Sequence, residues 1–275
     1  MHKRINFEQF TELDPKWVRS QILSFIKEDK PNGDLTTDSI IFNNKLVIAN
    51  MVAMEPFIFC GESYIPFSFP DGCKVTVLAT DGLEINAGDL IAKIIGPANK
   101  ILTFERVILN LVQRLCGIST ETRKYCVLNL PNGFKVMDTR KTTPGLRLFE
   151  KHAVSVGGGW NHRLNLSSAI LIKDNHLEAA GSIRNAISMI KKKVAKGIPI
   201  ELEVDTIDQL REGLEFDIDG FLLDNMKPEL VKECVQLIRE SNNGDSIFIE
   251  ASGGINFNTL ESYANTGCLL YTSDA

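Results

Sequence analysis

The second half of the chain alternates short apolar runs with amphipathic segments. Each apolar run is nearly continuous, as expected of a parallel strand that is buried on both faces. The intervening segments have helical periodicity, and strand–helix alternation predicts parallel strands joined by crossover helices. The predicted strands are residues 134–138, 169–173, 198–205, 220–224 and 246–252. The predicted helices are residues 146–156, 182–196, 206–214, 228–241 and 257–265, with approximate ends.

The first half has a different pattern. Residues 7–28 predict an amphipathic helix, and residues 45–101 contain short Val- and Ile-rich runs separated by turn signals. These runs predict a small β-rich unit. A strong helical stripe follows over residues 104–115, and we expect Gly117 to end that helix.

Charged residues and glycines follow all five predicted strands of the second half. In parallel α/β proteins, both closed barrels and open sheets build their sites at the C-terminal ends of the strands. The pattern therefore predicts a site at this edge, although it does not decide whether the barrel closes. The groups at the strand ends are Asp138-Thr139-Arg140-Lys141, Lys173-Asp174, Glu203 with Asp205, Asp224-Asn225 and Ser252-Gly253-Gly254.

The charge distribution indicates what this site binds. The 275-residue chain has a net charge of −5, which argues against a nucleic-acid partner. Residues 138–176 nevertheless contain six Arg or Lys and three of the four His against three carboxylates. A cationic cluster in an acidic protein predicts a pocket for a polyanionic small molecule.

Other sequence features limit the compartment and the class of protein. No apolar run reaches the roughly 18 residues that a membrane span needs. The N-terminus lacks the apolar core of a signal peptide. The six cysteines include no C-x-x-C pair, so neither a zinc ribbon nor a disulfide framework is indicated. We expect a cytoplasmic protein with reduced thiols and no membrane partner.

An ordered set of motifs resembles the nicotinate-nucleotide pyrophosphorylases, which are the carboxylating quinolinate phosphoribosyltransferases. The resemblance covers roughly residues 30–266 and rests chiefly on TRKTTPG, NHR and LIKDNH. The full set is DLTT (34–37), FERVILNLVQRLCGIST (104–120), DTRKTTPGLR (138–147), GGGWNHRLNLSSAILIKDNH (157–176), EVD (203–205), LLDN (222–225) and ASGGI (251–255).

The resemblance implies a fold and an assembly. It implies an N-terminal α/β sandwich domain, residues 1–115, followed by an incomplete, open α/β barrel, residues 116–275, that carries the active site. It also implies a homodimer or hexamer. We expect the match to stop near Gly267, so that a final strand, part of the phosphate cup and the return of the chain to the sandwich are missing.

The resemblance further implies the reaction. Quinolinate and phosphoribosyl pyrophosphate would give nicotinate mononucleotide, pyrophosphate and CO₂ in de novo NAD biosynthesis, with Mg²⁺ as cofactor. The implied substrate-binding residues are Arg106 from the neighbouring subunit, Thr139, Arg140, Lys141, His162, Arg163, Lys173, Glu203, Asp224, Ser252, Gly253 and Gly254. The implied catalytic residues are Lys141, Lys173, Glu203 and Asp224.

These residues divide by the part of the substrates they would meet. By resemblance, the quinolinate pocket is lined by Arg106, Arg140, His162, Arg163 and Lys173. Lys141 and Lys173 are also placed by motif to meet phosphate oxygens or pyrophosphate. By resemblance, Glu203 and Asp224 hold ribose hydroxyls and Mg²⁺, partly through substrate and water. Lys141 is the better candidate for assisting the departure of pyrophosphate. The exposed amides of the turn at residues 252–254 can hold the 5′-phosphate.

Several alternatives stay open. His176 is either structural or functional, and Arg147 belongs either to the pocket or to the scaffold. We expect Asp205 to be a cap or a structural group, and Lys151 and His152 to lie on a helix surface. The competing functions are a molybdenum-transport-associated paralogue of the same fold and a non-catalytic relative that has kept the pocket.

Overall fold

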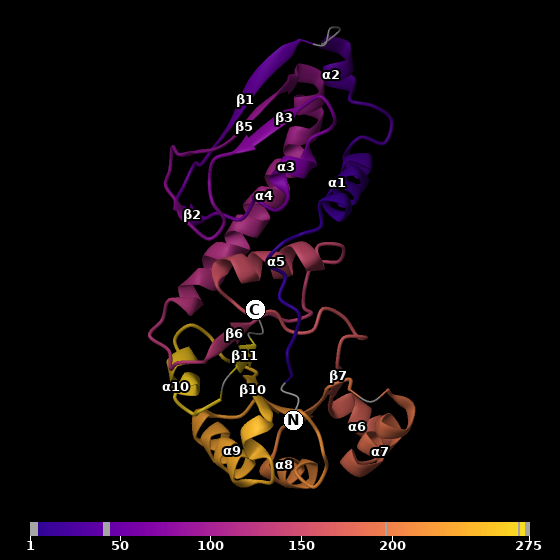
Figure 1. Cartoon of the computed structure of the whole chain (residues 1–275), viewed down its shortest axis with the longest axis vertical. Helices are drawn as coiled ribbons and strands as arrows, with labels where there is room; N and C mark the ends of the chain where they lie inside the picture. The colour runs from indigo at the N-terminus through magenta and orange to yellow at the C-terminus, as the bar shows by residue number, and fades with distance from the viewer. Residues whose placement is uncertain (1–4, 41–44, 196, 269, 273–275) are drawn as a thin grey trace. The chain divides into compact units, whose positions relative to one another are not determined.

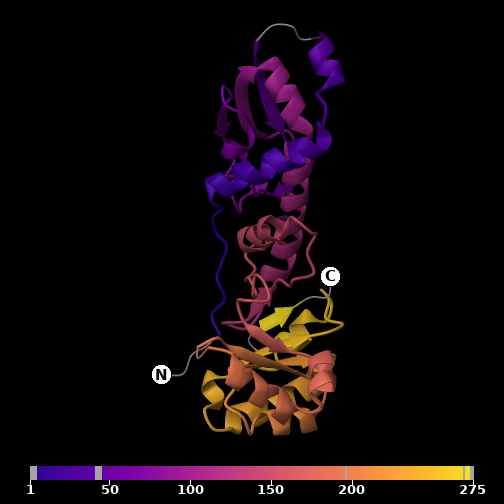
Figure 2. The same ribbon diagram turned by 90° about the vertical axis from the view of Figure 1, so that its right-hand side faces the viewer.

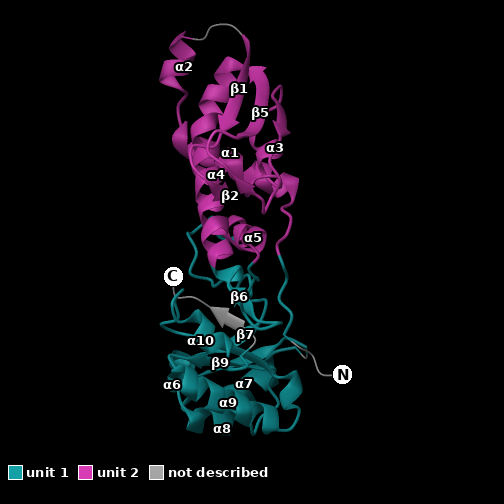
Figure 3. Ribbon diagram, turned by 90° about the vertical axis from the view of Figure 1, so that its left-hand side faces the viewer, with its two compact units in different colours: residues 1–9, 125–147, 159–275 teal, residues 10–124, 148–158 magenta. Residues whose placement is uncertain are grey.

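The computed structural model describes residues 5–40, 45–195, 197–268 and 270–272. It divides the chain into two compact units (Figure 3). The sandwich unit comprises residues 10–124 and 148–158, and the sheet unit comprises the described parts of 1–9, 125–147 and 159–275. The expected boundary at residues 115 and 116 therefore falls inside one continuous helix. Two short segments also belong to the unit opposite to the one expected.

The sandwich unit is built around an antiparallel sheet with strand order β1-β5-β3. Helix α4 runs along this sheet in both views of the ribbon (Figures 1 and 2). The strands are β1 (Leu46–Val52), β5 (Leu90–Pro97), β3 (Lys74–Val77) and the separate pair β2 (Phe57–Ile58) and β4 (Glu84–Ile85). The helices are α1 (Pro15–Asp29), α2 (Leu35–Ile40), α3 (Ile65–Ser68), α4 (Ala98–Cys126) and α5 (Arg147–Gly157).

The first helix begins later than its apolar pattern predicts. Asp14 accepts a hydrogen bond from the Trp17 amide, and Pro15 occupies the first turn. Both features are start signals for a helix. Residues 5–9 before them are not helical. The prediction of a helix from residue 7 was therefore wrong at its N-terminal end.

Helix α4 runs through Gly117, so the prediction that this glycine ends the helix was also wrong. A glycine inside a helix costs only about 1 kcal/mol relative to alanine, which a long amphipathic helix can offset. The Thr120 hydroxyl donates to the Cys116 carbonyl at 2.6 Å, and the Ser119 hydroxyl donates to the Ile58 carbonyl at 2.7 Å. These bonds tie the turn after Gly117 to the helix and to β2.

The sheet unit contains six parallel strands in the order β6-β11-β10-β9-β8-β7. No pairing joins β6 to β7 in the described part of the chain, so the sheet is open, as the family resemblance implied. The strands are β6 (Lys135–Met137), β7 (Ile170–Ile172), β8 (Ile200–Val204), β9 (Gly220–Asp224), β10 (Phe248–Ser252) and β11 (Leu270–Thr272). The helices are α6 (Asp174–Ala180), α7 (Ile183–Lys193), α8 (Ile207–Gly213), α9 (Pro228–Glu240), α10 (Leu260–Ala264) and the 3₁₀ turn η1 (Gly244–Ser246).

Strand β11 corrects the expectation that a final strand is missing. It lies between β10 and β6, with Glu250 opposite Leu270 and Met137 opposite Thr272. Ladder hydrogen bonds use backbone groups only, so a short segment can join the sheet without matching a side-chain motif.

The core of the sheet unit packs helices against the strands. Leu202, Phe221, Leu223 and Ile249 are fully buried in it, with Ile238 from α9. The apolar runs of the strands are therefore interior, as their continuity predicted. The rigid layer that results holds the strand ends, and the side chains that follow them, in fixed positions.

Candidate active site

A cavity of about 440 Å³ opens at the C-terminal ends of the strands of the sheet unit. It gathers most of the predicted site residues. Its lining residues are Asp138, Thr139, Arg140, Lys141, His162, Arg163, Leu171, Lys173, Glu203, Leu222, Asp224, Glu250 and Ser252. Residues from five different strand ends therefore meet at one place, which the parallel topology explains.

The loop after β6 is organised by Asp138, which was not among the predicted site residues. Its Oδ1 accepts the His162 amide at 2.8 Å, and its Oδ2 accepts the Asn161 side-chain amide at 2.7 Å. Thr139 Oγ1 accepts the Lys141 amide at 2.9 Å. Asp138 thus fastens the NHR segment to the strand that carries Arg140 and Lys141.

His162 is buried, and both ring nitrogens have partners within the protein. Nδ1 accepts the Arg163 amide at 2.7 Å, while Nε2 lies 3.2 Å from Glu250 Oε2 and 3.5 Å from Glu201 Oε2. Burial alone would lower the pKa of His162, but Glu250 and Glu201 raise it to about 10. Burial and then Glu250 raise the pKa of Glu201 to about 7. His162 and Glu201 therefore keep their protons to a higher pH than they would in water.

Sequence reasoning missed Glu201 and Glu250, which are 1% and 0% exposed. A usable signal was present, since Glu201 and Glu203 are two residues apart in a buried strand and so lie on the same face. Glu250 interrupts the apolar run of β10 in the same way. Glu201 Oε1 and Glu250 Oε1 are buried and have no hydrogen-bond partner in the described part of the chain.

Two guanidinium groups lie at the cavity. Arg163 donates from its Nη1 to the Ala169 carbonyl at 2.9 Å, which anchors a side chain that is only 7% exposed. Burial and the nearby Arg140 lower the pKa of the Arg163 guanidinium. Arg140 Nε is buried without a hydrogen-bond partner among the described residues. A pair of close, partly desolvated arginines favours an anion between them.

Another part of the cavity lining pairs a lysine with a carboxylate. Lys173 Nζ lies 2.8 Å from Glu203 Oε2. Burial raises the pKa of Glu203, while Lys173 lowers it. Asp224 accepts hydrogen bonds from the Ser252 hydroxyl and, at 2.6 Å, from the Asn225 side-chain amide. Glu203 and Asp224 are close enough for their charges to repel, which favours a cation beside them.

The turn after β10 depends on two glycines. Gly253 and Gly254 have φ values of +84° and +67°. A Cβ on Gly253 would collide with the side chain and the backbone of Asn225, whereas a Cβ on Gly254 would meet nothing within 4 Å. Ser252 lines the cavity, but neither glycine is among its lining residues. Their predicted contact with the 5′-phosphate stays a prediction.

The structure shows contacts for several residues whose roles were left open. His176 Nδ1 accepts the Lys173 amide at 2.9 Å and so caps α6, a helix that the sequence pattern did not predict. Arg147 donates to Thr142 Oγ1 at 3.0 Å and braces the loop after β6. The cap of α8 is Thr206 rather than Asp205.

Lys151 and His152 are both 0% exposed, so their predicted place on a helix surface was wrong. His152 Nδ1 lies 2.9 Å from the Phe10 carbonyl, and Nε2 lies 3.7 Å from Asp81. Arg106 is exposed on α4 of the sandwich unit and is not among the residues that line the cavity.

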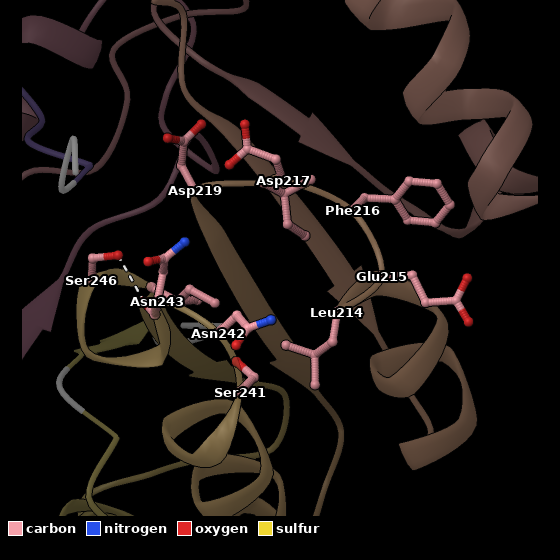
Figure 4. Close-up of a pocket in the computed structure, with 11 residues that line it drawn as sticks. Leu214, Glu215, Phe216, Asp217, Asp219, Ser241, Asn242, Asn243 and Ser246 are labelled. Atoms are coloured by element: carbon pink, nitrogen blue, oxygen red, sulfur yellow. Dashed lines mark hydrogen bonds between the residues drawn. The ribbon is translucent and has the colours of Figure 1, made fainter. Parts of the chain in front are cut away.

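A second hollow, of about 250 Å³, lies near the N-terminal ends of the strands (Figure 4). Its lining includes Glu215, Asp217 and Asp219, and no Lys or Arg among its described lining residues. A polyanion would be repelled there, so the charge pattern selects the cavity at the C-terminal ends.

Comparisons with known proteins show the family to which this chain belongs. The model of the quinolinate phosphoribosyl transferase C-terminal domain matches residues 118–274, and that of the N-terminal domain matches residues 34–116. The chain belongs to the quinolinate phosphoribosyl transferase family. The C-terminal match extends beyond Gly267, so the expectation that the resemblance stops there was wrong.

Individual relatives agree with this family. A probable nicotinate-nucleotide pyrophosphorylase (carboxylating) of Bacillus subtilis is 41% identical over 246 residues, which is 88% of this chain and 83% of that protein. The nicotinate-nucleotide pyrophosphorylase (carboxylating) of Mycobacterium leprae is 35% identical over 256 residues, covering 91% of this chain and 89% of that protein.

Solved structures of this phosphoribosyl transferase family share the fold. The nicotinate-nucleotide pyrophosphorylase of Francisella tularensis superposes with a TM-score of 0.85 at 31% identity, covering 98% of this chain and 94% of that chain. NadC of Streptococcus pyogenes superposes with a TM-score of 0.86 at 34% identity, covering 96% and 92%. In the described part of the present chain, no helix has the length and apolar character needed to cross a membrane.

Proposed function

We propose that this chain is the decarboxylating quinolinate phosphoribosyltransferase of NAD biosynthesis. It would join quinolinate to phosphoribosyl pyrophosphate and release pyrophosphate and CO₂. The observation that carries the proposal is that one cavity is lined by two groups of charges. The first, called the guanidinium side, is Arg140 with Arg163, and the second is Lys173 paired with Glu203, whose charge Asp224 affects. Family membership and the names of the relatives support it.

The guanidinium side suits a dicarboxylate. Quinolinate has two adjacent carboxylates on a planar ring, and the fork of an arginine donates two parallel hydrogen bonds to such a group. Burial and then the repulsion by Arg140 lower the pKa of Arg163. A bound dicarboxylate removes that repulsion and orients the ring nitrogen toward the other substrate.

The second side suits the phosphoribosyl donor. Bond breaking at the anomeric carbon leaves positive charge on the ribose and negative charge on the departing pyrophosphate. Lys141 and Lys173 offer ammonium groups to the pyrophosphate oxygens, while Glu203 and Asp224 accept ribose hydroxyls. Fixed charges of this kind stabilise a transition state because they need little reorganisation during the reaction. We assign Lys141 to the support of the leaving group.

The carboxylates of this side also fit Mg²⁺. This ion prefers oxygen ligands and takes few from the protein, keeping water and substrate oxygens for the rest. Glu203 and Asp224 satisfy that requirement, because each retains acceptor capacity beyond its bonds to Lys173, Ser252 and Asn225. When bound, Mg²⁺ would neutralise charge on pyrophosphate.

Loss of CO₂ follows formation of the glycosidic bond. The C–C bond to the carboxylate breaks, and its electron pair stays on the ring carbon beside the nitrogen. Ribosylation makes that nitrogen cationic, which stabilises the pair until a proton arrives. The protein therefore has to hold the ring and the ribose still during both steps, and residues from several strand ends can do so at once.

We also propose that the enzyme acts as a homodimer or a larger homo-oligomer in the cytoplasm, with Arg106 entering the site of a neighbouring subunit. Exposure of Arg106 and its place outside the cavity lining support this assignment. The sheet of the sandwich unit exposes apolar side chains, with Leu46 and Ile48 at 69% and 59%, which suits burial against another copy.

One assay tests the proposed reaction. The purified chain is incubated with Mg²⁺, phosphoribosyl pyrophosphate and quinolinate labelled in the carboxylate that is lost, and both CO₂ and mononucleotide are measured. We expect equal amounts of the two products. A parallel reaction with nicotinate should give no mononucleotide. An absence of turnover with quinolinate, from protein that is folded by circular dichroism, would refute the proposed function.

A further inference from the structure

The N-terminal segment, residues 5–9, is built into the sheet unit. Its side chains alternate, with Ile5 and Phe7 buried while Asn6 and Glu8 are exposed. Ile5 and Phe7 form an apolar cluster with Met137 of β6 and Ala169 beside β7. The segment therefore packs near both outer strands of the open sheet, β6 and β7.

This segment also makes direct contacts with the NHR residues of the cavity. The Phe7 ring stacks on the His162 ring, with centroids 4.2 Å apart and an angle of 27° between the planes. Gln9 Nε2 donates to the Asn161 carbonyl at 3.0 Å, and Gln9 Oε1 accepts the Asn161 amide at 2.8 Å. The Gln9 side-chain amide thus makes two hydrogen bonds with the Asn161 backbone, one as donor and one as acceptor, as the backbone of a neighbouring strand would.

These contacts complete the support of His162. Its ring edge is held by Glu201, Glu250 and the Arg163 amide, but stacking on Phe7 is what covers a ring face. Asp138 holds the NHR segment from β6, and Gln9 holds Asn161 from the N-terminal segment. A ring fixed at edge and face has one orientation, and through its contact with the Arg163 amide it also holds the backbone that carries the Arg163 guanidinium.

We propose that Phe7 and Gln9 are positioning residues for the dicarboxylate side of the cavity, acting through His162 and Asn161. This inference rests on the proposed function, because it assigns quinolinate to that side. Neither residue lines the cavity. Their loss should therefore weaken quinolinate binding more than binding of the phosphoribosyl donor, whose expected ligands are Lys141, Lys173, Glu203, Asp224 and the turn after β10.

The test measures equilibrium binding of quinolinate to the full chain by calorimetry, in wild type, Phe7→Leu and Gln9→Ala. Loss of an aromatic stack should weaken binding about three- to tenfold. Binding of phosphoribosyl pyrophosphate with Mg²⁺ should stay within about twofold, and in turnover the KM for quinolinate should rise more than kcat falls. Ile5→Val is the matched control, since it loosens the same apolar cluster without contacting His162.

A double-mutant cycle separates positioning from a general structural effect. In a His162→Ala background, Phe7→Leu should no longer change quinolinate binding, because the ring through which Phe7 acts is absent. An undiminished effect in that background, equal weakening of both substrates, or wild-type quinolinate binding in both Phe7→Leu and Gln9→Ala would each overturn the inference. If the wild-type chain itself fails to bind quinolinate, the proposed function fails instead.

Discussion

Glu201 and Glu250 place two carboxyl groups beside one imidazole in the interior of the sheet unit. Two buried carboxylates without protons would repel each other strongly, and burial disfavours the charge on each. His162 Nε2 lies within 3.5 Å of both carboxylates, so a proton on this nitrogen offsets their repulsion. The folded protein consequently holds more protons in this cluster than the unfolded chain does.

This excess of protons predicts the sign of a pH effect on stability. A pKa raised to about 7 for Glu201 and to about 10 for His162 means that stability falls as pH rises through this range. The free energy of unfolding, measured with urea at pH 6 and pH 9, should fall in wild type. Glu201→Gln, which mimics the protonated acid, should lose about 1–3 kcal/mol less over this interval. Equal losses in the two proteins would contradict this account.

The two glycines after β10 give a matched pair of substitutions. Gly253→Ala adds a Cβ that collides with Asn225, at a residue whose φ is positive. Gly254→Ala adds a Cβ that meets no atom within 4 Å, so its only cost is the strain of a non-glycine residue at positive φ. We expect Gly254→Ala to cost about 1 kcal/mol of unfolding free energy. Gly253→Ala should cost more and raise the KM for phosphoribosyl pyrophosphate, since Asn225 adjoins Asp224. Identical effects of the two substitutions would show that the Asn225 contact is unimportant.

At the scale of elements, helix α4 offers a test of its continuity. Gly117 is exposed within the helix, and a Cβ there would meet nothing within 4 Å. Gly117→Ala should therefore raise the unfolding free energy by about 0.5–1 kcal/mol. Gly157→Ala in α5 should lower it by about 1–3 kcal/mol, because its Cβ would overlap Thr122 and the Ser119 carbonyl. Thermal unfolding of both variants checks the two signs.

Strands β6 to β10 of the sheet unit were predictable because each is a nearly continuous apolar run between turn signals. Three other features of this unit were not predicted. Strand β11 has only three residues, α6 begins through a capping box between Lys173 and His176, and residues 5–9 look like the start of a helix. Each depends on contacts that are distant in sequence or on a local cap that an apolar pattern does not include.

The residues at the strand ends of the site were also predictable from the sequence, because their positions follow from the predicted strands. Parallel strands bring their C-terminal ends together, so Arg140, Lys173, Glu203 and Asp224 meet at one cavity once the topology is right. The groups that support them were harder to find. Glu250 belongs to a strand that reads as core, and its role depends on strand register and on which neighbour it faces, which local patterns do not contain.

At the scale of the whole molecule, the two units share one continuous helix, and the cavity lies within the sheet unit alone. The sandwich unit contributes Arg106 on α4, which is exposed, and an antiparallel sheet with exposed Leu46 and Ile48. A monomer would leave both features in water. The proposed association of identical chains would bury the apolar face and would give Arg106 a role in the site of the neighbouring subunit.

Mixed oligomers test this assignment of Arg106. Arg106→Ala and Lys173→Ala chains should each be nearly inactive alone, because each removes a cation from every site. After the two are unfolded together and refolded as a mixture, a dimer containing one of each has one complete site. Random pairing should then restore about a quarter of wild-type activity.

The control for that experiment pairs two residues that line the same cavity. Lys141→Ala mixed with Lys173→Ala should recover nothing, since every site then lacks a lysine whichever chains associate. Recovery in the control would mean that the cavity itself is shared between subunits. No recovery in the Arg106 mixture, with hybrid formation verified by differently tagged chains, would place Arg106 in the site of its own chain or outside the reaction. Only recovery confined to the Arg106 mixture assigns this arginine to the neighbouring subunit's site.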